Sequence, residues 1–193
     1  MRNQVQLIAY ADRLGGTLRG LLDLLEGPFA GLFGGVHLLP FFHPIDGADA
    51  GFDPIDHTAV DPRLGTWDDV AAIARKTAVM ADVIVNHVSS RSPQFLDFSA
   101  KGERSAYAGM FLTLDRVFPH GATEHDRRAI YRPRPGLPFT SITLADGSRR
   151  TLWTTFTAEQ IDIDVTHPRS IEYLESILRA LAAGGVTLAR LDA

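Results

Sequence analysis

The stretch Met80-Ala81-Asp82-Val83-Ile84-Val85-Asn86-His87 decides the fold class of this chain. A short apolar run that ends in polar side chains is typical of a buried strand whose carboxyl end reaches a functional site. Similar apolar runs occur on both sides of it along the chain. We expect buried strands at 5–10, 34–40, 80–85 and 186–191.

Amphipathic helices are predicted between these strands. Leucines recur at helical spacing after Thr17, a residue suited to N-capping, until Gly27-Pro28 ends the pattern. A second helix is expected after Thr66, and a third over 171–183. Strands that alternate with helices predict parallel βα units, either in a doubly wound sheet or in a barrel.

Polar residues follow the expected strands, at 12–13, 43–57, 86–87 and 190–192. A barrel builds its active site at this end of its strands. A doubly wound nucleotide-binding domain instead needs a glycine-rich phosphate turn, and Gly15-Gly16 lacks the G-x-G-x-x-G spacing. We therefore predict an α/β fold that contains the first four strands of a (β/α)8 TIM barrel.

The segment 88–166 is too long for an ordinary connection and carries aromatic residues of its own. Within it, two β-prone runs flank Ala145-Asp146-Gly147-Ser148, which predicts a hairpin. We predict that barrel units occupy 1–87. A small inserted subdomain after strand three is expected over 88–166, and the barrel is expected to continue through strand four over 167–193.

The composition excludes several classes of protein. The 193 residues are 45% hydrophobic, enough to bury a core, and a formal net charge of −4 disfavours nucleic acid and anionic membranes as partners. The absence of cysteine excludes a disulfide framework and a thiolate metal site. The sequence shows no signal-peptide pattern and no membrane-spanning apolar stretch, so we expect a cytoplasmic protein without a membrane partner.

Strand alternation places Arg190 and Asp192 on one face of the fourth strand. If that face lines a barrel, Asp192 projects into the pocket, and the neighbouring guanidinium favours its ionised form. An ionised carboxylate can attack an anomeric carbon and form a covalent sugar ester. The alternative is a structural ion pair at the strand end, which spacing alone favours.

Two other segments could contact a sugar. His87 follows strand three and could donate a hydrogen bond to a hydroxyl, although a histidine after an apolar strand is more often a satisfied buried group. In the loop 46–57, Asp49 could bind sugar hydroxyls while Phe52 offers an apolar platform. A turn in which aspartates bond their own backbone is the alternative for this loop.

Prolines stiffen the segment 131–138, which would present Arg134 from a preorganised loop. A guanidinium binds phosphate in a bidentate manner, so Arg134 is a candidate phosphate ligand. A solvated loop is the alternative. A peptide-docking PxxP motif is disfavoured because the segment lies inside the expected insertion.

Taken together, these segments resemble a known family. Asp82–His87 and Ala189–Ala193 are similar to two signature regions of the α-amylase superfamily, glycoside hydrolase family 13. The similarity to sucrose phosphorylases covers essentially the whole chain. The segments that show this similarity are 6–12, 35–42, the Asp49 loop, 131–139 and 160–164.

The resemblance implies a retaining glucosyltransferase. Asp192 would attack the glucosyl carbon of sucrose and expel fructose, and phosphate would then take the glucosyl group as α-glucose 1-phosphate. Neither a cofactor nor a metal is implied. By the same resemblance, Asp49, His87 and Arg190 would hold glucose, Phe52 would form part of the sugar platform, and Tyr131 and Arg134 would contact fructose or phosphate. The full set of implied substrate-binding residues is Asp49, Phe52, His87, Tyr131, Arg134, Gln160, Arg190 and Leu191.

Full members of this family continue well past the nucleophile, into a part that carries the general-acid glutamate and a further aspartate. Retaining chemistry needs a second carboxyl group about 5 Å from the nucleophile, so we expect these 193 residues to be inactive alone. A homodimer is possible for the full-length enzyme. Alternatives are a phosphorylase of glucosylglycerol, glucosylglycerate or sucrose 6-phosphate, an α-glucosidase-type hydrolase, and a noncatalytic sugar-binding module.

Overall fold

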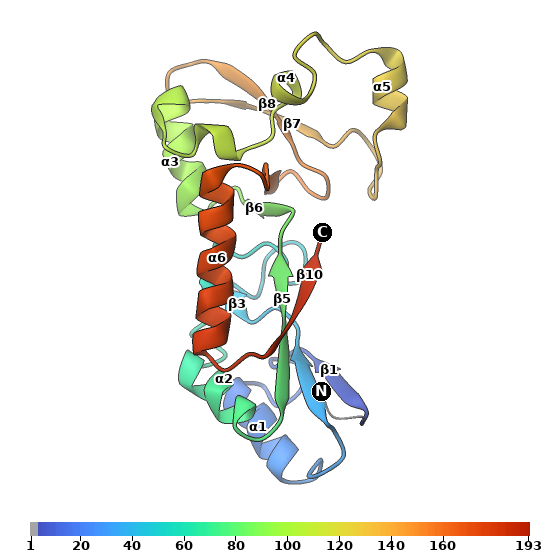
Figure 1. Cartoon of the computed structure of the whole chain (residues 1–193), viewed down its shortest axis with the longest axis vertical. Coiled ribbons are helices and arrows are strands. Elements are labelled where there is room, and N and C mark those ends of the chain that lie inside the picture. The colour runs from blue at the N-terminus through green and yellow to red at the C-terminus, as the bar shows by residue number, and fades with distance from the viewer. Residues whose placement is uncertain (1–3) are drawn as a thin grey trace. The chain divides into compact units, whose positions relative to one another are not determined.

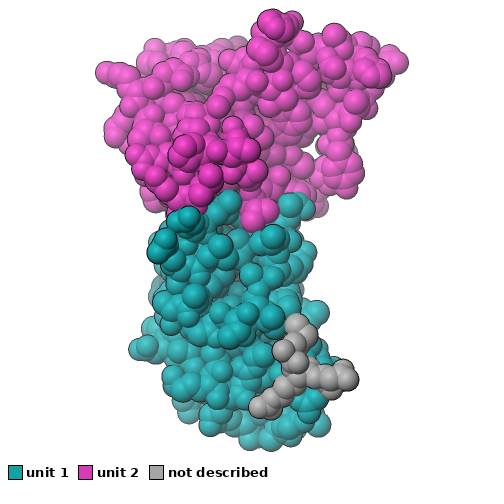
Figure 2. Space-filling view, viewed as in Figure 1, with its two compact units in different colours: residues 1–84, 173–193 teal, residues 85–172 magenta. Residues whose placement is uncertain are grey.

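The computed structural model describes residues 4–193, which divide into two compact units. One unit is formed by the chain up to Ile84 together with Tyr173–Ala193, and the other is Val85–Glu172. Figure 2 colours the two units separately. The expected division at 87/88 and 166/167 stays a prediction.

A four-stranded parallel sheet forms the centre of the first unit (Figure 1). Its strands are those expected from the apolar runs, so the α/β class and the parallel arrangement are confirmed. In order across the sheet they are β1 (Gln6–Ala9), β2 (Gly35–Leu38), β5 (Ala78–Ile84) and β10 (Leu188–Asp192).

The two central strands are buried, and one face of each carries apolar side chains. In β2, Val36 and Leu38 are each 1% exposed, and in β5 Val79 and Ala81 are fully buried. Continuous burial of this kind is expected for central parallel strands. The sheet core therefore fixes the strands that carry Asp82 and Arg190.

The helix α1 (Leu18–Glu26) begins where the sequence predicted. Thr17 caps it, because its side chain accepts a hydrogen bond from the Gly20 amide at 3.0 Å. Leu18 and Leu21 are fully buried. The apolar face of the helix therefore supplies the stabilising burial that its short length requires.

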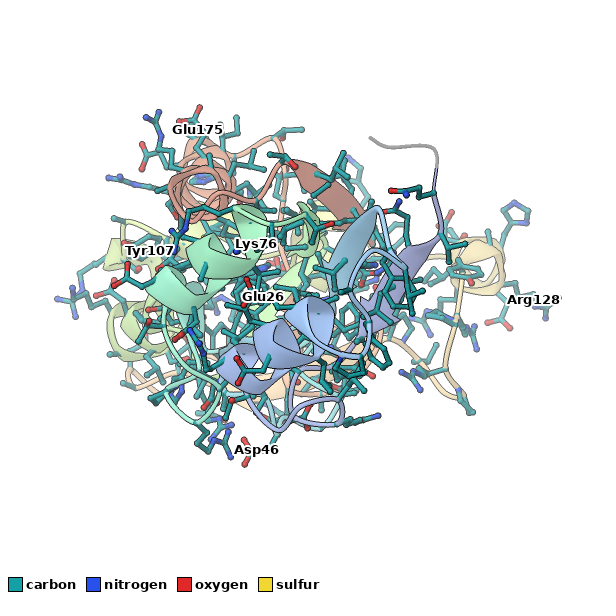
Figure 3. All side chains as sticks on the ribbon, turned by 90° about the horizontal axis from the view of Figure 1, so that it is seen from below. Glu26, Asp46, Lys76, Tyr107, Arg128 and Glu175 are labelled. Atoms are coloured by element: carbon teal, nitrogen blue, oxygen red, sulfur yellow. The ribbon has the colours of Figure 1, made fainter. Side chains whose placement is uncertain are left out.

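The helix α2 (Trp67–Ala74) starts with a capping box in which Thr66 and Asp69 bond each other's backbone. An ion pair joins Lys76, just past this helix, to Glu26 of α1 at 2.6 Å (both labelled in Figure 3). Both groups are about half exposed, so this pair contributes little free energy.

The helix α6 (Pro168–Ala183) begins three residues before the predicted start at Ile171. Proline is compatible with a first helical turn, because its missing N–H has no intrahelical partner there. The helix ends at Gly184-Gly185, as predicted. A Cβ at Gly184 would lie 2.4 Å from the Trp67 ring, so glycine permits a close approach to α2.

Short strands that the sequence did not predict also occur. In the first unit, β3 (Phe42–His43) and β4 (Asp56–Val60) pair antiparallel and bracket the Asp49 loop. In the second unit, β6 (His87–Ser89) pairs antiparallel with β9 (Gln160–Asp162). The expected third strand therefore ends at Ile84, and His87 begins a separate strand.

The second unit contains the predicted hairpin, formed by β7 (Phe139–Thr143) and β8 (Arg149–Trp153). Aromatic rings form the core of the second unit, where the Phe111 ring centroid lies 5.2 Å from those of Phe95 and Phe98. Its remaining elements are α3 (Pro93–Lys101), two 3₁₀ turns (Gly102–Arg104, Ala108–Met110), α4 (Leu114–Val117) and α5 (Glu124–Ala129). None of the helices within residues 4–193 has the length and apolar character that a membrane crossing requires.

Candidate active site

Asp82 is the buried centre of a polar network that crosses three neighbouring strands. Its side chain is fully buried on β5. One carboxylate oxygen lies 3.0 Å from His37 Nε2 on β2, and the other accepts a hydrogen bond from Arg190 Nη1 on β10 at 2.6 Å. The backbone register already places Arg190 opposite Asp82. A buried carboxylate needs such partners, because leaving its charge uncompensated would be costly.

Arg190 connects this buried network to Asp192. Its second guanidinium nitrogen lies 2.5 Å from Asp192 Oδ1. The hydrogen bond to Asp82 raises the pKa of Arg190 above its usual value, with a further contribution from the Asp192 charge. Arg190 is therefore a permanent cation between two carboxylates. The two side chains meet as strand alternation requires, while the role of Asp192 as nucleophile stays a prediction.

Phe52 and Asp49 lie on the loop between β3 and β4. The Arg190 guanidinium carbon is 6.0 Å from the centre of the Phe52 ring, at the outer limit of a cation–π contact. Buried Asp53 accepts hydrogen bonds from the backbone amides of Ala48 at 2.9 Å and Asp49 at 3.4 Å. Asp53 thus fixes the backbone that carries Asp49.

The opposite end of this loop is held by an ionic clamp. Asp61 accepts a hydrogen bond from the Ile45 amide at 3.0 Å, and Arg63 binds both Asp61 at 2.7 Å and Asp46 at 2.8 Å. The Arg63 guanidinium lowers the pKa of Asp61 to about 2. The carboxylate therefore stays ionised and keeps the loop attached to the end of β4 at neutral pH.

Tyr10 and Arg13 belong to the same region. The sequence marked Arg13 as a polar residue after the first strand, and it did not select Tyr10. The Arg13 guanidinium lies 4.3 Å from the centre of the Tyr10 ring. Burial raises the pKa of Tyr10, and the nearby charges of Asp82 and Asp49 raise it further. The signal that could have identified Tyr10 is its place directly after β1, at the same strand ends as the other candidates.

His87 and Gln160 meet in the second unit. They lie on the paired strands β6 and β9, are 4% and 0% exposed, and their Nε2 atoms are 3.0 Å apart. The His87 ring also packs edge-on against Phe156, with 5.5 Å between centroids. His87 is therefore held in one orientation by a polar and an aromatic contact.

Asp162 is a second buried carboxylate of this unit, and the sequence did not select it. It is 3% exposed and accepts hydrogen bonds from the amide of Thr155, at 3.1 Å, and from the Thr155 hydroxyl. Burial raises the pKa of Asp162, although the Thr155 bonds oppose this shift. Alternation along β9 places Asp162 on the same face as Gln160, which is the sequence signal that could have found it.

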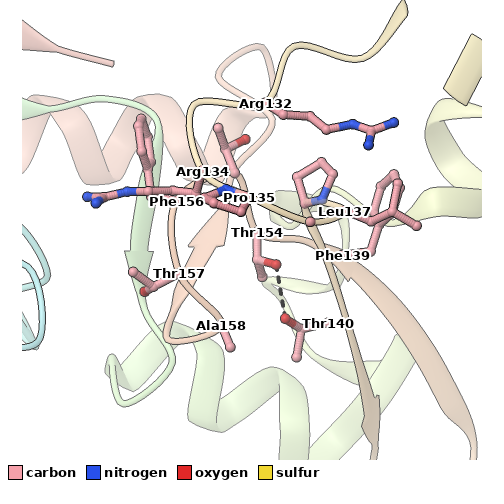
Figure 4. A pocket seen from close by; sticks show the side chains of 13 residues that line it. Arg132, Arg134, Pro135, Leu137, Phe139, Thr140, Thr154, Phe156, Thr157 and Ala158 are labelled. Carbon is pink, nitrogen blue, oxygen red and sulfur yellow. Dashed lines mark hydrogen bonds between the residues drawn. The ribbon is translucent and has the colours of Figure 1, made fainter. Parts of the chain in front are cut away.

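Arg134 lines a cavity of about 210 Å³ in the second unit (Figure 4). The Thr140 and Thr154 hydroxyls, 2.9 Å apart, are part of its lining, and Phe139 and Phe156 contribute apolar wall. The cavity is thus both cationic and hydroxyl-lined, a combination suited to an anion.

The remaining predicted site residues are exposed. Tyr131 is 79% exposed and is not among the residues that line the Arg134 cavity, and Leu191 on β10 is 69% exposed. The structure brings Phe52, Arg190 and Asp192 together in the first unit. It brings His87 and Gln160 together in the second. Within residues 4–193, no group of three or more His, Cys, Asp or Glu side chains is arranged to hold a metal ion.

Similarity to known proteins extends over the whole chain. The sequence is 59% identical to the sucrose phosphorylase of Agrobacterium vitis and 57% identical to that of Bifidobacterium adolescentis, each over 194 aligned residues that cover 100% of this chain. The chain is homologous to sucrose phosphorylases. It spans 40% and 38% of the length of these two relatives. No protein-family model matches the chain.

The fold is shared with a crystal structure of a related enzyme. The sucrose 6F-phosphate phosphorylase from Thermoanaerobacter thermosaccharolyticum matches with a TM-score of 0.93 and 40% identity, covering 100% of this chain and 40% of that one. The resemblance predicted from the sequence is therefore confirmed. The match is to the amino-terminal part of glycoside hydrolase family 13 enzymes.

Proposed function

We propose that this chain acts in a glucosyltransferase that converts sucrose and phosphate into α-D-glucose 1-phosphate and fructose with retention of configuration. The observation that carries the proposal is the contact between Arg190 and Asp192, which the buried Asp82 anchors. An oriented, ionised carboxylate at a strand end is what covalent glycosyl transfer needs. The 57% and 59% identities to sucrose phosphorylases support this choice of substrate.

In the proposed reaction, an Asp192 oxygen bonds to the anomeric carbon of the glucosyl unit while the glycosidic bond breaks and fructose leaves. A phosphate oxygen then attacks the same carbon, the ester bond breaks, and the carboxylate of Asp192 is restored. Arg190 orients the carboxylate through both steps. The general acid that protonates fructose is proposed to lie outside these 193 residues, so that the chain alone does not turn over.

The other candidate residues take roles in substrate binding. Asp49 and Arg190 would hydrogen-bond glucosyl hydroxyls, and Phe52 would present its ring to the sugar face. His87 and Gln160 would bind further hydroxyls from their buried strands. We assign Tyr131, Arg134 and Leu191 to the acceptor side, with phosphate bound by the Arg134 guanidinium. No cofactor or metal takes part in this scheme.

We also propose that the parallel sheet is the first half of a (β/α)8 barrel and that the insertion after strand three forms a separate subdomain. The order β1-β2-β5-β10 supports this, because strands follow one another across the sheet without reversal. A doubly wound sheet reverses its strand order at the point where ligands bind.

The test is phosphorolysis by a chimera in which this chain replaces the matching amino-terminal part of the Bifidobacterium adolescentis enzyme. We expect release of glucose 1-phosphate from sucrose and phosphate. Asp192→Asn should abolish nearly all turnover. Asp68→Asn, an exposed aspartate in the first turn of α2, serves as the matched control and should be silent. Retained turnover in the Asp192 variant would remove the nucleophile assignment.

The donor has an alternative. The structural match to a sucrose 6F-phosphate phosphorylase favours sucrose 6-phosphate as a second candidate. The same chimera should be supplied with sucrose, sucrose 6-phosphate, glucosylglycerol and glucosylglycerate in turn. Sucrose should give the highest kcat/KM, and binding without turnover of any donor would instead favour a noncatalytic sugar-binding module.

A further inference from the structure

A second arginine-lined cavity lies in the unit Val85–Glu172, with a volume of about 430 Å³. We name it the Arg149 cavity. Residues from α4 and the segment after it form one part of its lining, and β8 and α5 supply the rest. Its volume is within the range of small-molecule sites. It shares no lining residue with the Arg134 cavity, so it is not part of the site described above.

Positive charge is in excess around this cavity. Arg127, Arg149 and Arg150 line it, against a single carboxylate, Asp115. Arg150 is held in place, with one guanidinium nitrogen 3.1 Å from Glu103 and the other donating to the Arg149 carbonyl at 3.0 Å. In the part of the chain that the structure describes, neither Arg127 nor Arg149 forms an ion pair with a carboxylate.

The charge excess has a physical consequence. Arg150 is paired with Glu103, whereas Arg127 and Arg149 line the same hollow without a carboxylate partner among the described residues, so a bound dianion would gain charge-assisted hydrogen bonds from both of them. The planar fork of arginine fits the oxygens of a phosphate group. Because the whole chain carries a formal net charge of −4, this local excess is not a general property of its surface.

The rest of the lining suits a carbon body with hydroxyl groups. Leu114 and Phe118 form apolar wall, and the Phe118 ring is stacked on Trp153 at 6.2 Å between centroids, which fixes its position. A hydrogen bond from the Thr113 hydroxyl lowers the pKa of Asp115, so its carboxylate is available as an acceptor for a hydroxyl.

We propose that the Arg149 cavity binds a phosphate monoester of a small polyhydroxylated molecule, with Arg127 and Arg149 on the phosphate and Asp115 on a hydroxyl. This site is independent of the proposed sucrose reaction.

Trp153 provides the readout. Of the two tryptophans in the chain, Trp153 contacts the wall of the cavity through Phe118, whereas Trp67 lies in the other unit. The full chain, in a Trp67→Phe background, should be titrated with glucose 6-phosphate, inorganic phosphate and glucose at constant ionic strength. We expect a saturable fluorescence change with glucose 6-phosphate, a dissociation constant below about 1 mM, weaker binding of phosphate, and none of glucose.

Matched variants locate the binding. Arg127→Ala and Arg149→Ala should each weaken it about tenfold through loss of a charge-assisted contact. Arg128→Ala is the control. Arg128 is exposed on α5 next to Arg127 (Figure 3), pairs with Glu124 at 3.1 Å and does not line the cavity. It should leave the affinity unchanged.

Further controls separate this site from the Arg134 cavity. Trp153 also contacts Phe139, which lines that cavity, at 4.9 Å between centroids, so the titration is repeated with Arg134→Ala. Persistence of the signal supports the Arg149 cavity. The proposal would be overturned if the signal were lost in Arg134→Ala, or if Arg128→Ala weakened binding as much as Arg127→Ala and Arg149→Ala do. It would also be overturned if the signal did not saturate by about 10 mM ligand. Inorganic phosphate binding as tightly as the ester would overturn the ester specificity.

Circular dichroism accompanies each titration and shows that each arginine variant is folded. Arg149→Lys keeps the charge and removes the bidentate fork, and it should weaken glucose 6-phosphate binding severalfold while leaving the spectrum unchanged. Unchanged affinity in Arg149→Lys would contradict a phosphate held by the guanidinium fork.

Discussion

The region around Arg190 and the cavity around Arg134 are built in different ways. Arg190 and Asp192 project from a strand and are tied to Asp82, which is fully buried and also bonded to a second strand. Arg134 projects from an exposed, proline-rich loop. The comparison teaches that the proposed nucleophile is fixed by the sheet core, whereas the proposed phosphate ligand depends on local turns. Substitutions should therefore affect stability and activity together at the first region, whereas substitutions on the exposed loop of the second region should affect activity with little loss of stability.

The largest effect is expected for Arg190→Ala. It would leave the buried Asp82 carboxylate with His37 but without its cation, and would release Asp192. Because Arg190 is 47% exposed, the cost in the free energy of unfolding should be about 2–3 kcal/mol, below that of a fully buried pair. The midpoint temperature of thermal unfolding and the rate of glucose 1-phosphate release from the chimera should both fall sharply. Adding Asp82→Asn should restore much of the stability but not the turnover. An Arg190→Ala chain as stable as the parent would contradict the view that Arg190 is tied to the sheet core.

A smaller and pH-dependent effect is expected for Asp61→Asn, which loosens the Asp49 loop. The pKa of Asp61 is about 2 in the folded chain, below the ordinary value near 3.9. Its contribution to stability is therefore present above about pH 4 and is lost as the pH falls through about 2. Because Arg63 is about half exposed, we expect about 1–2 kcal/mol at pH 7.

Denaturant titrations of the parent and the Asp61→Asn variant at pH 7 and pH 3 measure this contribution. The difference in unfolding free energy between them should shrink at the lower pH. A difference that stays constant would mean that Asp61 acts through packing and not through its charge.

A modest effect is expected for Thr155→Val, which removes the hydroxyl bond to the buried Asp162 but keeps the backbone bond. The free energy of unfolding should fall by about 1 kcal/mol. Because Thr155 also lines the Arg134 cavity, the KM for phosphate in the chimera should rise while the hydrolytic turnover of sucrose stays the same. Thr143→Val, at an exposed position of β7 that lines neither arginine cavity, is the matched control for loss of a threonine hydroxyl.

The smallest effect on stability is expected for Tyr131→Ala, since the side chain is 79% exposed. Its unfolding free energy should stay within about 0.5 kcal/mol of the parent. The KM for phosphate or the rate of fructose release should nevertheless change if Tyr131 acts on the acceptor side. An unchanged kinetic profile would remove Tyr131 from the proposed site and sharpen the contrast with Arg190.

The strands and helices of the first unit could be predicted because local signals agree there. Apolar runs mark β2 and β5, and the caps at Thr17 and Thr66 mark helix starts. The two-residue strand β3 has no such signal, because its pairing depends on a partner beyond the loop. Short strands of this kind follow from tertiary contacts and not from periodicity.

The candidate site was predicted unevenly for the same reason. Alternation was sufficient to pair Arg190 with Asp192, since both lie on one strand. It could not pair Arg190 with Asp82, because that contact depends on the register between two strands far apart in the chain. For Asp162, alternation places the carboxylate on the same face as Gln160 but gives no sign of its partner Thr155.

Gly47 has a consequence for anyone who would engineer the Asp49 loop. A methyl group there would lie 2.0 Å from an Asp53 oxygen, although the backbone at Gly47 is not in the left-handed region. The restriction is therefore one of space, and it is imposed by the neighbour that braces the loop. In a saturation library, position 47 should accept a larger residue only in clones that also carry a smaller residue at position 53. Gly121 has open space around it, so a single substitution there should cost only the strain of its left-handed backbone.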